Sequence, residues 1–379
     1  MNKAINLLKR SATNIPGWRT NRKIVVIESD DWGSIRMPSR EVYNMLLKGG
    51  IRVDLCPYNR FDSLASEDDL SALFEVLTRF RDKNGNHPVI TANTVVANPD
   101  FEKIKTSEFE KYHYEPFTET LKKYPAHKKS FELWKQGIKE KVFHPQFHGR
   151  EHVNVPLWLE LLKQNHPVFF PAFENQLWGL GRKISNTGKI SIQAAYDTLE
   201  PKELEKQKNA IKEGLILFED IFGYSSESFI ANNFIWDPSI NSVLSESGIS
   251  ILQGMKYQKL PLLNTTKRKM IRHYTGKINK LGQVYLVRNC VFEPSQYPNI
   301  DSVTECLKDI SNAFFWKKPA IITSHRLNCI GFIDPVNRDK NLFSFKKLLA
   351  SILKNWPEVE FMTSSDLGRH LFFKKPYSK

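Results

Sequence analysis

Eight short runs rich in β-branched and aromatic residues recur along the chain, and amphipathic stretches separate many of them. Two of these stretches, LSALFEVLTRFRDK from Leu70 and PKELEKQKNAIKEGLILFEDIFG from Pro201, place apolar residues every three or four positions, as helices do. Strands that alternate with helices predict a parallel sheet, either open or closed into a barrel. The eight runs cover residues 24–28, 89–96, 142–147, 229–236, 249–255, 284–292, 320–325 and 359–363.

The length and the apolar content allow these elements to form one large domain. The chain has 379 residues, of which 41% are hydrophobic, and this is enough for a sizeable buried core. It contains no internal repeat, no low-complexity tract and no linker rich in Pro, Gly or Ser. We therefore expect a single domain over residues 21–372, preceded by a basic segment at 1–20 and carrying an insertion around 40–140.

Charge and cysteine content limit the partners and the compartment. The formal net charge of +14 favours an anionic partner, but it does not choose among a nucleotide, a lipid phosphate, an acidic glycan and nucleic acid. The four cysteines lie far apart without a CxxC pair. Their spacing argues against a zinc knuckle and fits a reducing compartment.

The amino-terminal segment bears on location. Its apolar run at residues 4–8 is short and is interrupted by Asn6, so it is too weak for the core of a signal peptide. No later segment reaches the roughly eighteen apolar residues of a membrane span. We expect a cytoplasmic protein. The segment can also form a basic amphipathic helix on an anionic membrane surface, although a solvated helix packed on the domain is the simpler expectation.

Polar residues collect where several of the predicted strands end. Asp30 and Asp31 follow the first run, and the later sequences are HPQFHGREH from residue 144, ANNFIWD from 231, VRNCVFEP from 287 and SHR from 324. In α/β barrels the carboxyl ends of the strands converge on one face, and functional sites are built there. The segments therefore predict one shared site.

Two histidines have the spacing of a metal site. His148 and His152 are four residues apart, which brings both imidazoles to one side of a helical turn. With one carboxylate they would form a two-His, one-Asp site that leaves positions open for water and substrate. An isolated HxxxH pattern is a weak signal by itself. His144, which precedes the pair, is expected to have a packing or supporting role.

Three motifs occur in a fixed order along the chain: Asp30-Asp31, His148-x-x-x-His152 and His325 at a strand end. This ordered set resembles the polysaccharide deacetylase superfamily, the NodB-homology domain of carbohydrate esterase family 4. The resemblance covers roughly residues 20 to 370. It implies an α/β fold, namely a distorted (β/α)7 TIM-like barrel with insertions.

The resemblance also implies a role for each motif residue. Asp30 is expected to be the catalytic base, and His325 the general acid. Asp31, His148 and His152 are expected to bind one divalent metal ion. Zinc suits these ligands, while nickel, cobalt and manganese are compatible with them.

Hydrolysis of an acetamide explains why these residue types are needed together. A bound metal would polarise the carbonyl and lower the pKa of water. Asp30 would accept the proton of the attacking water, and His325 would protonate the leaving amine. The two adjacent carboxylates would then have separate roles, one on the metal and one beside it. A capping or turn cluster is the alternative for the Asp-Asp pair.

Two motifs depart from the family pattern. Gly149 stands where Ser or Thr usually follows the first histidine, so a hydrogen bond that shapes the loop is missing. The Arg-Pro motif of the family corresponds to Ala-Asn-Asn-Phe at residues 231–234, which contains no arginine. Arg150, Arg288 and Arg326 are the candidates to supply this charge from another strand.

Further residues are candidates for contact with the substrate. Trp32 is a candidate for stacking on a sugar, although aromatic residues at such positions belong more often to the core. Strand alternation sends Arg326 to the side opposite His325, which makes it a weaker candidate. The full set is Trp32, Asn232, Asn233, Arg288 and Arg326.

A histidine that donates a proton near neutral pH benefits from a carboxylate that raises its pKa. Asp197, Asp237 and Glu293 are the candidates for this partner of His325. The alternative for His325 is a structural role at the end of its strand.

Three functions are compatible with these residues. The leading one is a metal-dependent hydrolase that removes the N-acetyl group of an amino sugar, in a cytoplasmic nucleotide- or lipid-linked glycan precursor. The second is hydrolysis of another non-peptide C–N bond, in an amide or cyclic ureide. The third is a non-catalytic carbohydrate-binding barrel, which has no need of a base, a metal site and an acid together. We expect no nucleic-acid partner.

Overall fold

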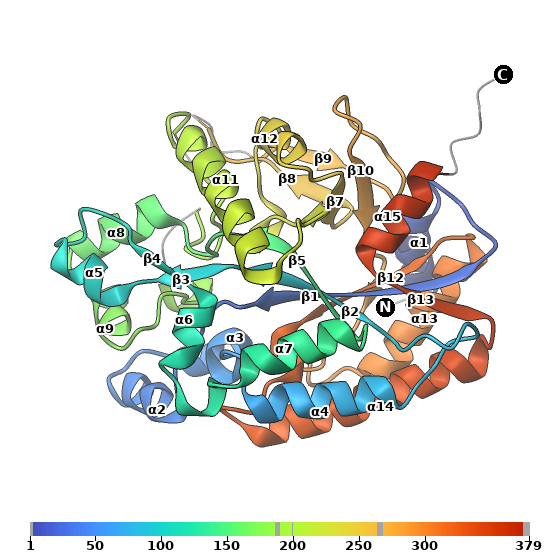
Figure 1. The fold of residues 1–379 in the computed structure, drawn as a ribbon, viewed down its shortest axis with the longest axis horizontal. Coiled ribbons are helices and arrows are strands. Elements are labelled where there is room, and N and C mark those ends of the chain that lie inside the picture. Colours follow the sequence, from blue (N-terminus) through green and yellow to red (C-terminus); the bar gives the residue numbers. More distant parts are fainter. Residues whose placement is uncertain (1–2, 186–189, 199, 264–267, 374–379) are drawn as a thin grey trace.

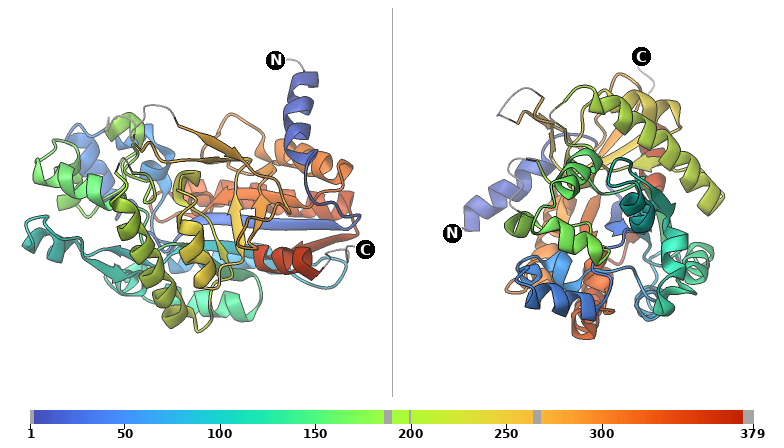
Figure 2. Two further views of the ribbon diagram at one scale, coloured as in Figure 1. Left: turned by 90° about the horizontal axis from the view of Figure 1, so that it is seen from above. Right: turned by 90° about the vertical axis from the view of Figure 1, so that its left-hand side faces the viewer.

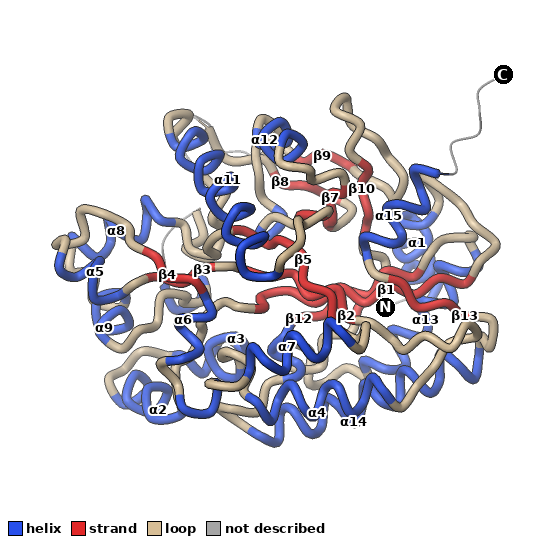
Figure 3. Tube along the Cα trace, in the orientation of Figure 1, coloured by secondary structure: helices blue, strands red, loops and turns tan. Residues whose placement is uncertain are grey.

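The computed structural model describes residues 3–185, 190–198, 200–263 and 268–373. Within these residues the main sheet has nine strands, and every pair of neighbours in it is parallel. Figure 3 shows these strands at the centre of the molecule. They are β1 (Lys23–Trp32), β2 (Ile90–Val95), β5 (Phe143–Gly149), β6 (Ser228–Phe229), β7 (Ile251–Gly254), β10 (Val284–Val287), β11 (Cys290–Val291), β12 (Ala320–His325) and β13 (Val359–Met362).

The two ends of this sheet are consecutive in the chain. The strand order is β10-β7-β6-β5-β2-β1-β12-β11, and only Arg288 and Asn289 separate β10 from β11. The Arg288 N–H donates to the Gly254 carbonyl of β7 at 2.9 Å, whereas the Asn289 N–H donates to the Ile321 carbonyl of β12 at 3.1 Å. The chain changes partner between these two residues and so joins the edges of the sheet. The predicted distorted (β/α)7 barrel is confirmed.

Strand β13 makes the barrel irregular. It pairs with β1 from Lys23 to Val26, whereas β2 pairs with β1 only from Ile27 onward. The long first strand therefore has different neighbours at its two ends. This strand is buried along almost its whole length, as its apolar run predicts.

Helices cover the sheet and connect its strands. In Figure 1, α4, α7 and α14 lie together on one side, and α11 lies on the other. The helical patterns from Leu70 and Pro201 correspond to α4 and α11. The helices are α1 (Lys3–Asn14), α2 (Arg40–Lys48), α3 (Pro57–Phe61), α4 (Glu67–Thr78), α5 (Phe101–Thr106), α6 (Phe117–Lys122), α7 (Ser130–Lys139), α8 (Val155–Lys163), α9 (Phe169–Glu174), α10 (Arg182–Ser185), α11 (Glu203–Phe222), α12 (Ile240–Glu246), α13 (Ser302–Phe315), α14 (Pro335–Asn355) and α15 (Ser364–Phe373).

Alternation along β1 separates the barrel interior from the outer core. Val25 and Ile27 belong to the large apolar cluster that includes α4 and α14. Ile24 and Val26 belong to a second cluster with Leu367 of α15, which closes the amino end of the barrel. The alternation places the next two residues of this second face, Glu28 and Asp30, deeper in the barrel toward its carboxyl end.

Residues 40–140, where we expected an insertion, also contain barrel elements. Strand β2 lies inside this range, with α4 before it and α7 after it. A hairpin of β3 (Ala97–Pro99) and β4 (Tyr114–Pro116) extends from it. A second hairpin, outside this range, is formed by β8 (Tyr257–Lys259) and β9 (Met270–Arg272).

The amino-terminal segment forms helix α1, which projects from one side of the domain in both views of Figure 2. Its carboxyl half is bound to α13, because Arg10 pairs with Asp309 at 2.5 Å and Asn14 donates to Asn312 at 2.9 Å. Contact of this helix with a membrane stays a prediction. Among the described residues, none of the helices combines the length and the apolar character needed to cross a bilayer.

Candidate active site

Asp30 lies at the carboxyl end of β1 in a fully polar setting. Its side chain is 2% exposed and accepts a bidentate pair of hydrogen bonds from Arg288, with both N–O distances at 2.6 Å. Asn93 of β2 also donates to it, at 2.7 Å. Burial raises the pKa of Asp30, but Arg288 outweighs burial and holds this pKa below its ordinary value. Asp30 is therefore an oriented carboxylate that is ionised at neutral pH.

Arg288 in turn pairs with a second buried acid, Glu28. Its Nε donates to Glu28 at 2.5 Å, and Ser364 of α15 donates to the other oxygen of Glu28 at 2.7 Å. The Thr323 hydroxyl accepts from Arg288 at 3.0 Å. Among the three arginines considered from the sequence, Arg288 is the one that contacts Asp30. It comes from the junction between β10 and β11, and not from residues 231–234, where the family pattern has its arginine.

Asp31 reaches the same site although it neighbours Asp30, because its backbone has a φ of 74°. This left-handed conformation is uncommon for residues other than glycine. It breaks the alternation that would send Asp31 to the outer face. The carboxylate then lies 3.1 Å from His152 Nε2 and 3.5 Å from His148 Nε2. Its other oxygen accepts from Arg36 at 3.1 Å.

The three side chains Asp31, His148 and His152 fit a divalent metal ion. Their ligand atoms all lie within 4.8 Å of one another, and all three residues are buried. His148 Nδ1 lies 2.8 Å from the Ile230 carbonyl, which can only accept, so Nδ1 carries the proton and Nε2 is left as a lone-pair donor toward Asp31. The predicted ligands are thus brought together in a set suited to zinc or a similar ion.

His325 lies at the end of β12, opposite Asp30 in the strand register. Its Nε2 is 3.8 Å from Asp30, and its Nδ1 is 2.5 Å from Glu293. Burial lowers the pKa of His325, but the Glu293 carboxylate more than compensates and raises this pKa to about 9. Glu293 is the partner among the three carboxylates considered from the sequence. Asn328 donates to its second oxygen at 2.8 Å and holds it in place.

Trp32 does not line the site. Its side chain is 1% exposed, and its ring packs edge-on against Phe143 at 4.7 Å and Trp134 at 5.9 Å between centroids. Its indole N–H donates to Ser29 at 2.9 Å. With both faces in the core, Trp32 cannot stack on a sugar, and the structure replaces our expectation of substrate contact by a packing role.

Arg326 is also directed away from the site, as alternation indicates. It is completely buried and forms a bidentate pair with Asp62, with both N–O distances at 3.0 Å. Asp62 lies 3.7 Å from Arg36, which contacts Asp31. The substrate contact that we expected for Arg326 is thus not seen. It compensates the charge of Asp62, which lies behind Arg36 and Asp31.

Arg326→Ala is expected to destabilise the fold by about 3–5 kcal/mol, because it leaves the buried Asp62 without its main partner. Arg369→Ala is the matched control, since Arg369 pairs with Glu227 and Asp366 at the surface, where such pairs contribute at most about 1 kcal/mol. Thermal and urea unfolding of both variants measure the difference. Equal losses of stability would contradict the role of Arg326.

The two asparagines after β6 occupy different positions. Asn232 is buried and donates to the His148 carbonyl at 3.1 Å, so it supports the first histidine. Asn233 has a φ of 54° and lines the cavity around the predicted site. Of the two, only Asn233 is placed for direct contact with a substrate.

The structure explains why residue 149 is glycine and not the Ser or Thr of the family pattern. Its φ is 119°, a conformation that side chains rarely adopt, and a Cβ there would lie 2.8 Å from the Tyr196 hydroxyl. Tyr196 occupies the space that a Ser or Thr side chain would need. The loop between the two histidines is therefore shaped by packing on Tyr196.

The sequence did not single out three residues that complete the site. Arg36 contacts Asp31 and lies over the Trp178 ring at 4.7 Å, Asn93 donates to Asp30, and the Tyr58 ring contacts the His325 ring edge-on at 5.3 Å. Asn93 lies inside the predicted strand at 89–96 and inside β2, so the strand-end argument did not reach it. Arg36 and Tyr58 lie in a loop and a short helix, where no periodic pattern marks them.

The candidate site encloses a cavity of about 70 Å³. A water molecule occupies ~30 Å³ of liquid, so the cavity has room for a water and a small group such as an acetyl. It is lined by Asp30, Asp31, Arg36, Tyr58, His148, His152, Gln193, Ala231, Asn233, Phe234 and His325.

The fold and the site together define a class of structure, a distorted α/β barrel with an Asp-His-His cluster at the carboxyl ends of its strands. No family model and no curated protein matches the sequence. Solved structures with a similar course of the chain include several described as polysaccharide deacetylases.

Three of these structures show the extent of the similarity. A Mycobacterium smegmatis protein assigned as a polysaccharide deacetylase is 10% identical, with 96% of each chain covered and a TM-score of 0.48. A Puue allantoinase is 9% identical, with 95% of this chain and 94% of the other covered and a TM-score of 0.49. A 4-alpha-glucanotransferase from Thermococcus litoralis is 9% identical, with a TM-score of 0.46; 94% of this chain is covered, but it spans only 41% of that protein. Similarity at this level assigns no activity.

Proposed function

We propose that the protein is a metal-dependent hydrolase of a non-peptide C–N bond, and that its substrate is an N-acetylated amino sugar. One observation carries the proposal. Asp30 and His325 lie on adjacent strands, 3.8 Å apart, beside three side chains that fit one metal ion. A base, an acid and a metal site in one small cavity are the groups that amide hydrolysis requires.

The residues divide the chemistry among them. Asp31, His148 and His152 would hold the metal, which when bound supplies Lewis acidity for the carbonyl and for water. Asp30, oriented by Arg288, accepts a proton from the attacking water. His325, protonated at neutral pH, donates a proton to the leaving amine. Arg36 keeps the Asp31 carboxylate in position through its second oxygen.

Intact-mass analysis of incubated substrates tests the reaction. Loss of an acetyl group lowers the mass of an N-acetylated sugar, whereas opening of a cyclic ureide adds one water. The proposal expects the first result, with N-acetylglucosamine and its nucleotide- and lipid-linked forms as the first substrates. Opening of a cyclic ureide without deacetylation of any sugar would show that the substrate is a ureide and not an N-acetylated sugar. No mass change in any substrate, with metal bound, would contradict a hydrolase.

Glu293→Gln is expected to shift the alkaline limb of kcat/KM toward lower pH. His325 must be protonated to act as an acid, so activity falls as pH rises through its pKa of about 9. Without the carboxylate, burial lowers this pKa, and the limb should move down by about two pH units or more. Asp237→Asn is the control, because Asp237 caps a turn through the Ser239 N–H. An unchanged limb in Glu293→Gln would argue against His325 as the acid.

A further inference from the structure

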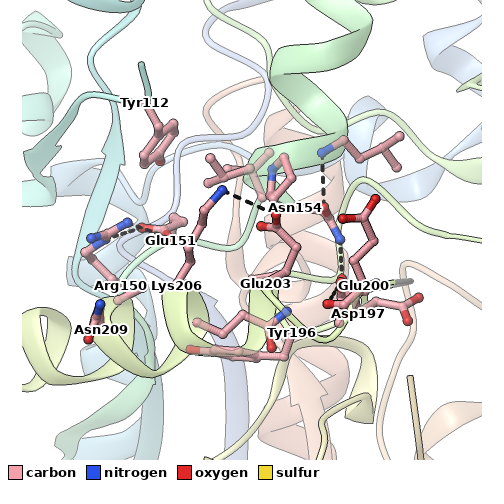
Figure 4. Close-up of a pocket in the computed structure, with 18 of the residues that line it drawn as sticks. Tyr112, Arg150, Glu151, Asn154, Tyr196, Asp197, Glu200, Glu203, Lys206 and Asn209 are labelled. Atoms are coloured by element: carbon pink, nitrogen blue, oxygen red, sulfur yellow. Dashed lines mark hydrogen bonds and ion pairs between the residues drawn. The ribbon is translucent and has the colours of Figure 1, made fainter. Parts of the chain in front are cut away.

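A second and larger cavity lies on the other side of the histidine loop. Its volume is about 650 Å³, and its wall includes Tyr112, Tyr114, residues 150–151 and 153–157, and the amino half of α11 (Figure 4). The residues described around it include none of those that line the catalytic cavity. The two cavities are neighbours all the same, because Glu151 lines this one and His152 lines the other.

Three polar atoms in this wall are buried without a hydrogen-bond partner in the described structure: Tyr112 Oη, Glu203 Oε2 and Gln207 Oε1. Glu203 and Gln207 are each only 8% exposed. A buried acceptor without a partner costs roughly 1–3 kcal/mol, more when it is charged. These atoms are covered in this structure, so a ligand in the cavity would satisfy them after a rotation of the side chains that carry them.

The charges of the wall select the kind of ligand. The cations are occupied by acids, since Arg150 pairs with Glu151 and Glu213, and Lys206 lies 3.3 Å from Glu203. Lys202 pairs with Glu200. The lining contains six acids, Glu151, Glu160, Asp197, Glu200, Glu203 and Glu213, against three bases, Arg150, Lys202 and Lys206. Asp197 is also paired, with Arg268 outside this lining. The remaining acids still exceed the bases by two, so a phosphate or carboxylate would meet repulsion here, whereas hydroxyl groups would find acceptors.

The remaining wall is apolar or aromatic. Figure 4 shows Tyr112 and Tyr196 on opposite sides of the cavity, with Glu203 between them in this view. Val155, Pro156 and Leu157 contribute aliphatic surface. Aromatic side chains beside hydrogen-bonding groups suit a ligand with apolar faces and polar edges. Sugar rings have this character.

We propose that this cavity is a binding site for neutral sugar units, separate from the catalytic cavity. Hydroxyl groups of the sugar donate to Glu203 Oε2 and Gln207 Oε1, and Tyr112 supplies a hydroxyl that donates or accepts. Nothing in this assignment depends on the reaction proposed for the catalytic cavity.

Calorimetric titration of the full-length protein tests the site, with maltotriose, cellotriose and triacetylchitotriose as probes. The Asp30→Asn variant is used as the background so that turnover does not disturb the heats. We expect at least one of these neutral trisaccharides to bind. Glu203→Gln and Gln207→Leu should each weaken its binding by about tenfold, because each removes an acceptor of a buried hydrogen bond.

Glu205→Gln is the matched control for Glu203→Gln. It makes the same change two residues away on α11, where the side chain is 72% exposed and pairs with Lys208. Binding should stay within about twofold of the background, and equal melting temperatures would show that both variants fold. Absence of binding at about 10 mM trisaccharide, or equal affinity in Glu203→Gln, Gln207→Leu and the background, would overturn the site. Binding at this site, together with no mass change in any N-acetylated substrate incubated with the wild type, would refute the proposed reaction alone.

Discussion

If Asp31, His148 and His152 bind a divalent ion, as we propose, the wild-type protein should carry about one ion per chain and His148→Ala should lose it. The proposed site has three protein ligands, and the substitution leaves two. Loss of an outer-shell partner alone lowers metal affinity by about 10–100-fold, so loss of a ligand should lower it by more than ~100-fold. Elemental analysis after dialysis measures the metal content, and the wild type loaded with zinc, nickel, cobalt or manganese identifies the preferred ion.

His144→Ala is the matched control for this experiment. His144 lies on the same strand, four residues before His148, and it stacks on Tyr224 with centroids 5.8 Å apart. Its removal takes away an imidazole without touching Asp31. Full metal content in His144→Ala and trace metal in His148→Ala are the expected pair of results. Equal content in the two variants would reject the ligand assignment.

Asp30→Asn is expected to keep the metal and to lose roughly two to four orders of magnitude in turnover, the usual contribution of a general base. The amide has nearly the same shape but cannot accept the proton. Asp31 should keep its position, because its own backbone conformation and Arg36 hold it. The rate is measured on the substrate that the mass analysis identifies, and the metal content is measured on the same sample.

Asp31→Asn provides the comparison for Asp30→Asn. It should lower both metal content and turnover, since Asp31 lies 3.1 Å from His152. If Asp30→Asn lost the metal while Asp31→Asn retained it, the two carboxylates would have the opposite roles. Circular dichroism of both variants separates loss of function from unfolding.

The strands could be predicted from the sequence because each is a short apolar run, and each of the eight runs overlaps a strand of the main sheet. What the runs could not show is their partners. Residues 284–292 read as one strand, yet they form β10 and β11 with different neighbours. The run at 229–236 shares only Phe229 with β6, because the chain turns at Asn232–Phe234, where Asn233 and Phe234 have positive φ angles.

The residues of the candidate site also divide into those whose proximity could be predicted from the sequence and those whose contacts could not. Asp30, Asp31 and the two histidines are placed by local motifs, so their proximity could be predicted. The contact of Arg288 with Asp30 joins residues that are 258 positions apart, and the contact of Glu293 with His325 depends on the pairing of β11 with β12, so no local pattern reveals either one. Trp32 was misjudged because nearness in sequence does not set the direction of a side chain.

The position of Arg288 at the junction of β10 and β11 makes the geometry around Asp30 depend on the pairing of β11 with the rest of the sheet. Strand β11 pairs with β12 through only two residue pairs, Cys290 with Ile322 and Val291 with Thr323, so few backbone contacts secure this edge of the sheet. If it opens, the other pairings can persist while Asp30 loses its guanidinium partner. Asp30, the proposed base, would thus keep its Arg288 partner only in molecules in which β11 is paired with β12. A molecule in which β11 has detached would be inactive, and not partly active. Hydrogen exchange at the Asn289 amide, compared with turnover under mild denaturant, would follow this opening, and activity that outlasts protection of that amide would contradict the link.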